Sequence, residues 1–127
     1  MTNSDFYTDT LRLIGVLSEI ESASPEQGVQ AMRVLNAIMA DWEEEGVDIG
    51  YYEQTDLTDD LPLPSHARAG VKYFLAVALA PEYGKSVPPD LVALGDKFFS
   101  RLIRESVIRR LKESTLDHLP LGEGQWG

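Results

Sequence analysis

The segments Asp60-Leu-Pro-Leu-Pro-Ser-His66 and Leu79-Ala-Pro-Glu-Tyr-Gly84 frame one apolar stretch and decide the fold of this chain. The two prolines of the first segment predict an extended approach, because a residue before proline avoids the helical region. A helix is then expected from about Ser65, ended or kinked by Pro81 and completed by Gly84. Residues at helical spacing predict its buried stripe: Val71, Phe74, Leu75, Ala78 and Leu79.

A second helix is predicted upstream, from Ser24-Pro25-Glu26-Gln27 to Gly46. Serine at the N-cap, proline at the first position and glutamine at the third form a capping box, and Gly46 supplies a left-handed stop. Glu43–Glu45 occupy the last turn, where the helix macrodipole disfavours acids. A partner surface could relieve this unfavourable electrostatic interaction. The predicted apolar face is Val29, Met32, Leu35, Met39 and Trp42. Residues 47–63 predict an extended segment or one short strand.

The two outer helices complete the expected bundle. The first is predicted over residues 5–20, capped by Ser4 or Thr8, with an apolar face of Leu11, Ile14, Val16, Leu17 and Ile20. The last begins at Pro88-Pro89 and runs to about Ser114, close to 40 Å at ~1.5 Å per residue, so one end is expected to project. Its predicted stripe is Leu91, Leu94, Phe98, Phe99, Leu102, Ile103, Val107 and Leu111.

Length and composition favour one small globular domain. The chain has 127 residues, 43% of them hydrophobic, and no cysteine. No apolar run approaches the ~18 residues of a membrane span, and residues 1–5 lack the positive start of a signal peptide, so an intracellular soluble chain is expected. We therefore predict an all-α fold. Residues 1–118 form a small bundle of about four helices, the last of them long, and residues 119–127 form an extended, flexible C-terminal tail.

Charge is unevenly distributed along the chain. The net charge of −10 argues against a simple nucleic-acid binder, since phosphate binding requires lysine and arginine. Most acids lie in residues 1–62, where Arg12 and Arg33 are the only bases. Residues 97–112 carry six bases against Glu105 alone. This polarity suits complementary packing between copies of the chain.

The residues do not indicate catalysis, a metal site or a cofactor. His66 and His118 are not paired at ligand spacing. Asp56, Asp59 and Asp60 lack the order of acids, glycine and glutamate of a calcium loop. No glycine-rich phosphate loop or Gly-x-Ser-x-Gly elbow is present. Two alternatives stay open: a regulatory or nucleic-acid-binding module that uses the basic face of 97–112, and a small hydrolase that uses the acids.

Several segments together resemble the head-to-tail adaptor family (head-completion proteins, or tail accessory factors) of short-tailed bacteriophages and their prophages. The resemblance covers about residues 9–112, with a departure between Gly46 and Leu61, where relatives often carry a longer β-rich insertion. It includes a Leu-Asn pair near the middle of the second helix and a tryptophan shortly before Glu-Gly. The matching segments are Leu11-Arg-Leu-Ile-Gly-Val-Leu17, Ser24-Pro-Glu26, Ala31–Gly46, Leu61-Pro-Leu-Pro64 and Leu79–Gly84.

The resemblance implies a structural virion protein of the head-tail neck, made in the host cytoplasm. It implies a ring, typically of twelve copies, that assembles on the portal protein after DNA packaging, extends the DNA channel and offers the attachment site for downstream tail proteins. DNA would pass without specific binding, no membrane is implied, and a single copy is expected to be monomeric in solution. By the same resemblance, the residues expected to face the portal or a neighbour are Arg104, Arg109, Arg110, Leu119, Leu121 and Trp126.

Overall fold

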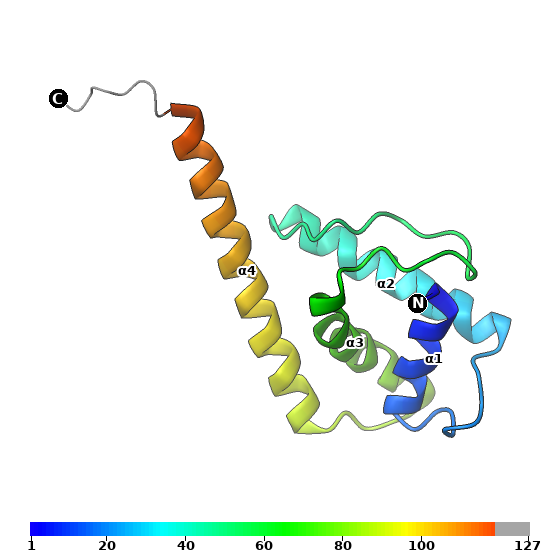
Figure 1. Ribbon diagram of the computed structural model, residues 1–127. Coiled ribbons are helices and arrows are strands. Elements are labelled where there is room, and N and C mark those ends of the chain that lie inside the picture. Colours follow the sequence, from blue (N-terminus) through cyan, green and yellow to red (C-terminus); the bar gives the residue numbers. More distant parts are fainter. Residues whose placement is uncertain (119–127) are drawn as a thin grey trace.

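The computed structural model describes residues 1–118, and the side chains of residues 1–113. The all-α prediction is confirmed: within this part the only β pairing is an isolated bridge between Thr2 and Asp60. Helix α3 packs against each of the other α-helices, and α4 crosses it and runs on past the body (Figure 1). The elements are α1 (Asn3–Leu13), α2 (Pro25–Glu44), α3 (Ser65–Leu79), the 3₁₀ helix η1 (Ala80–Tyr83) and α4 (Pro89–His118).

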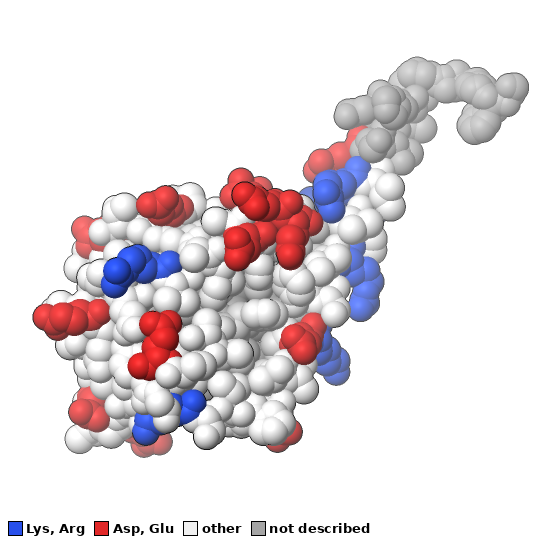
Figure 2. All heavy atoms as spheres, turned by 180° about the vertical axis from the view of Figure 1, so that it is seen from behind, with Lys and Arg blue, Asp and Glu red and all other residues white. Residues whose placement is uncertain are grey.

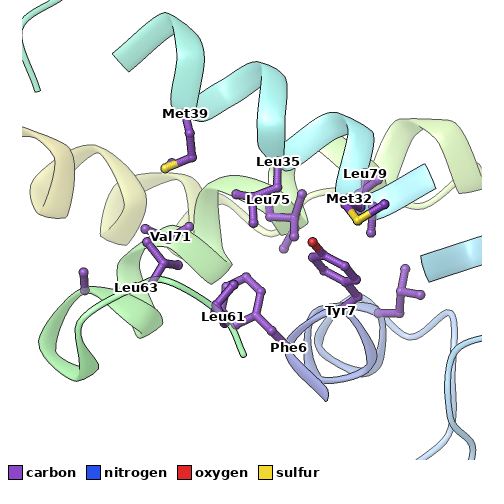
Figure 3. Close-up of a cluster of buried hydrophobic side chains, with 14 of the residues drawn as sticks. Phe6, Tyr7, Met32, Leu35, Met39, Leu61, Leu63, Val71, Leu75 and Leu79 are labelled. Carbon is purple, nitrogen blue, oxygen red and sulfur yellow. The ribbon is translucent and has the colours of Figure 1, made fainter. Parts of the chain in front are cut away.

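The Leu-Pro-Leu-Pro segment delivers two side chains to the core. Leu61 and Leu63 are buried, whereas Pro62 and Pro64 are half-buried, so alternate residues of this extended path face inward. Figure 3 shows both leucines in the core cluster with Phe6 of α1 and Val71 of α3. The predicted stop is also confirmed, since η1 follows α3 directly and Gly84 adopts a left-handed φ of 68°.

The predicted extent of the first helix was wrong. It begins after Thr2, whose hydroxyl accepts a hydrogen bond from the Asp5 backbone N–H at 3.1 Å, so Thr2 is the cap rather than Ser4 or Thr8. It ends at Leu13 because Gly15 turns the chain with a φ of 78°. Ile20, predicted to be buried, is 93% exposed. Two residues of the predicted face reach the core from the loop instead: Ile14 and Leu17.

Helix α2 matches its prediction at both ends. The Ser24 hydroxyl accepts from the Gln27 N–H at 3.2 Å, and the Gln27 side-chain oxygen accepts from the Ser24 N–H at 2.9 Å. Trp42 is buried against Phe74 and Phe99, with ring centroids 5.0 and 4.9 Å apart.

One residue of the predicted α2 face was misplaced. Val29 is 42% exposed. Its neighbour Gly28 lies on the buried face instead, where a Cβ would approach the side chain of Leu57 to 2.9 Å. A residue without a side chain therefore makes the close contact, which a pattern of apolar residues cannot indicate.

The predicted stripe of the last helix was only partly correct. Helix α4 continues to His118, beyond the predicted end at Ser114. Two of its buried positions, Gly95 and Ser106, are small residues that a hydrophobic pattern does not identify. All described side chains after Ser106 are exposed. The buried positions are Leu91, Gly95, Phe98, Leu102 and Ser106. The predicted core residues that are exposed instead are Leu94, Ile103, Val107 and Leu111.

The stripe of α3 needs a smaller correction. Val71, Leu75 and Leu79 are buried as predicted, but Phe74 and Ala78 are only half-buried. The close contact with α4 is made at Gly70, where a Cβ would lie 2.0 Å from the ring of Phe98. The absent side chain is what allows α4 to pack this closely on α3.

Residues 45–64 follow an extended path that side chains of α1 and α2 fix in place. The Asn36 amide donates to the Gln54 carbonyl and accepts from its N–H, both at 3.0 Å, and the Tyr51 hydroxyl donates to the same Asn36 oxygen at 2.5 Å. The fully buried Asn3 donates to the Gln54 side chain at 2.8 Å and to the Asp56 carbonyl at 2.9 Å. Side-chain amides therefore take the place of a strand partner here.

Two tyrosines at this network predict an alkaline limit to stability. Burial raises the pKa of Tyr7 and of Tyr51 above the ordinary value. The folded chain holds these protons more tightly, so stability is complete below the unfolded pKa of about 10 and is lost as pH rises above it. Urea denaturation between pH 8 and 11.5 should show this fall. Tyr51→Phe, which removes one of the two hydroxyls with a raised pKa, should make the fall shallower.

Candidate functional site

Between α3 and α4 lies an open, positively charged groove of about 460 Å³. Phe98 packs on Gly70 where the two helices cross, which gives the groove an apolar floor. The Arg101 guanidinium lies 5.0 Å from the centre of the Phe98 ring, so it stays close to the floor. We call this the cationic groove; its basic lining residues are His66, Lys97, Arg101 and Arg104, all of them exposed.

The charge of the groove is weakly compensated within the chain. Among the described side chains its one ion pair joins Arg101 to Glu105 at 3.9 Å, with both side chains about half exposed. Such exposed pairs contribute little, because water screens them. The groove therefore remains available to an anionic partner.

The opposite flank of α4 faces the end of α2. Phe99 packs on Trp42, and farther along the helix the Arg110 guanidinium lies over Gly46. A Cβ at Gly46, whose φ is 89°, would come within 2.7 Å of that guanidinium. A cation near the carboxyl end of a helix opposes the negative end of its dipole. The Arg110 guanidinium is therefore well placed beside the carboxyl end of α2.

Exposed acids gather where α2 ends. Figure 2 shows a patch of acidic side chains on the part of the body from which α4 emerges, while bases along α4 lie at the edge of the same view. Among the described side chains, no base lies within 4.0 Å of these acids. We call them the acidic ridge: Asp41, Glu43, Glu44 and Glu45.

The residues predicted to face a portal do not form one surface. Arg104 lines the cationic groove, Arg109 lies over the segment around Asp48, and Arg110 lies against Gly46 on the other flank. Arg109 and Arg110 thus share the depression beside Gly46 and Asp48, while Arg104 lies apart from them in the groove. The other predicted contacts lie outside the described residues: Leu119, Leu121 and Trp126.

The sequence pattern did not predict that the apolar side chains of the projecting end lie on the surface. Val107, Ile108 and Leu111 are exposed, Leu111 by 62%. Val107 and Leu111 had been predicted in the core stripe and Ile108 had not, but the body ends before it reaches any of the three (Figure 1). The signal that could have found them is the excess length of the helix over the body, which the sequence did contain.

Comparison with protein families decides where this chain belongs. The family model described as P22 tail accessory factor matches residues 1–126. The chain belongs to this family. As a tail accessory factor it is a structural component of a phage virion, associated with the tail. This agrees with the non-enzymatic interpretation of the sequence.

The motifs that carried the resemblance have structural roles in this tail accessory factor. The asparagine of the Leu-Asn pair is Asn36, which holds the segment around Gln54, and Trp42 joins α2 to α3 and α4. Within the described residues no group of three His, Asp or Glu side chains could hold a metal ion. No described helix combines the length and apolarity that a membrane crossing requires.

Proposed function

We propose that this tail accessory factor is a head-to-tail adaptor that assembles as a ring, expected to hold twelve copies, on the portal protein after DNA packaging. The ring extends the DNA channel and presents the attachment site for the next tail component. DNA passes through it without specific contacts, which suits a net charge of −10. A single copy is monomeric in solution, because contacts that are weak one by one become strong when many form together.

The projecting end of α4 is the observation that carries this proposal. Beyond Ser106 every described side chain of the helix is exposed, and Val107, Ile108 and Leu111 are apolar. Most helices in proteins depend on tertiary packing of an apolar face. The packing surface for this end lies outside the described body. We assign it to the portal, with Arg109, Arg110 and the segment from Leu119 to Trp126 as further contacts.

The test uses the full chain and the portal ring of the same phage. We expect Val107→Asp/Leu111→Asp to weaken co-migration with the ring at least tenfold, because two charges would be buried against the partner. Val92→Asp is the matched control: Val92 is 38% exposed, like Val107 at 40%, but lies at the other end of α4. Circular dichroism should show that all variants fold, since these side chains lie outside the core.

Two outcomes would count against the adaptor. One is a wild-type chain that does not co-migrate with the portal ring. The other is equal binding by the Asp variants and the wild type. A DNA mobility shift at low salt, run in parallel, tests the regulatory or nucleic-acid alternative, which predicts a shift without portal binding. The bases of residues 97–112 are divided between different sides of α4, which makes one continuous DNA-binding face a poor fit.

A further inference from the structure

We propose that the cationic groove of one copy receives the acidic ridge of the next, so that the ring closes through repeated head-to-tail contacts. This inference rests on the proposed ring and assigns the residues of its neighbour contact. The groove is a depression with an apolar floor and a cationic rim, and the ridge is a helix end with four exposed acids. The two surfaces are therefore complementary in charge.

The acidic ridge is unfavourable in an isolated copy. Acids in the last turn of a helix lie at the negative end of its dipole, and each costs a few tenths of a kcal/mol when exposed. Asp41 and Glu45 of the ridge are also four residues apart, a spacing at which like charges on a helix repel. The nearby Arg110 lies over Gly46 and forms no ion pair with the ridge among the described side chains. A cationic partner would relieve this repulsion.

The groove and the ridge cannot meet within one copy. Lys97, Arg101 and Arg104, spaced by three or four residues, lie on the flank of α4 toward His66. The ridge lies at the end of α2, which contacts the other flank of α4 through Phe99. Surfaces on different flanks of one copy can each contact a different neighbour, as heterologous contacts require, and such contacts close into rings when the rotation permits.

Engineered cysteines test this contact directly, because the chain contains none of its own. Ala69 is an exposed groove residue and Glu44 lies on the ridge. Under a mild oxidant, Glu44→Cys/Ala69→Cys bound to portal rings should form a ladder of covalent oligomers, whereas each single variant should form dimers at most. Glu44→Cys/Ala37→Cys, with an exposed alanine on α2 instead, should form no ladder. No ladder, or a ladder of equal yield from the control, would overturn the inference.

Reversing the charges of the groove and the ridge gives a second test, which leaves the projecting end of α4 unchanged. Lys97→Glu/Arg101→Glu makes the groove acidic, and Glu43→Lys/Glu44→Lys/Glu45→Lys makes the ridge basic, because Asp41 is then its one remaining acid. Each variant alone places like charges in every neighbour contact, so successive copies should bind the portal ring without cooperativity. An equimolar mixture restores opposite charges at every contact and should recover it. If the wild type binds the portal but the mixture does not recover cooperative binding, the neighbour contact is refuted and the adaptor proposal is unaffected.

The remaining outcomes separate the two proposals. If the wild type does not bind the portal, the adaptor fails, and the cysteine ladder at high protein concentration still decides the neighbour contact. A low-salt DNA shift that Lys97→Glu/Arg101→Glu abolishes, together with no cysteine ladder, would show that the groove binds nucleic acid instead and would overturn the inference.

Discussion

Replacing Gly70 with alanine is expected to destabilise the bundle by about 3 kcal/mol, the upper part of the range for overpacking a core. The added Cβ would lie 2.0 Å from ring atoms of Phe98, far inside van der Waals contact. Both residues are buried where α3 crosses α4, so neither can move without separating the helices. Chemical denaturation followed by circular dichroism measures the net loss of stability. This net value is what remains after alanine's advantage of ~1 kcal/mol over glycine in a helix has been subtracted from the cost of the steric clash.

Gly95 provides the matched control for this substitution. It is a buried glycine of α4 where a Cβ would lie 3.6 Å from the ring of Phe74, an ordinary contact. Gly95→Ala should therefore be neutral or stabilise the chain by up to ~1 kcal/mol. A Gly70→Ala variant as stable as the wild type, or equal losses from both glycines, would show that the crossing of α3 and α4 does not depend on this contact.

Local chemistry explains which parts of the fold could be predicted. The capping box at Ser24, the stop at Gly84 and the extended approach through Pro62 and Pro64 depend on backbone preferences that act over a few residues. The first helix was overextended because an apolar residue in a loop, such as Leu17, has the same hydrophobicity as one in a helix. Only the turn at Gly15 distinguishes them.

The surface of α4 could not be predicted in the same way. Periodicity shows that a helix has an apolar face, but not what covers it. Gly95 is buried because α3 passes close to it, and Ser106 is buried on the side of α4 toward Gly46 and Asp48, while Val107 and Leu111 are exposed because the body has ended. The cationic groove likewise requires the crossing of two helices, and within one helix its bases are indistinguishable from an ordinary solvated face.

The largest effect expected outside the helix crossing is at Asn36. Asn36→Ala should destabilise the chain by about 2–3 kcal/mol, because the Gln54 N–H and carbonyl and the Tyr51 hydroxyl all lose their partner in a part-buried site. Gln30→Ala is the matched control on the same helix. Its amide donates to Glu82 at an exposed site and accepts from the Tyr83 hydroxyl at a part-buried one, so one partner instead of three is left in a part-buried site and the loss should be about 1 kcal/mol.

The position of the loss matters as much as its size. Gln54 joins Asn36 on α2 to Asn3 on α1, so releasing Gln54 also weakens the hold on the start of α1. Hydrogen exchange in Asn36→Ala should therefore accelerate in residues 51–56 and in the first turn of α1, while the centre of α3 keeps its protection relative to global unfolding. Uniform acceleration across the chain would mean that Asn36 supports the whole bundle instead of positioning this segment.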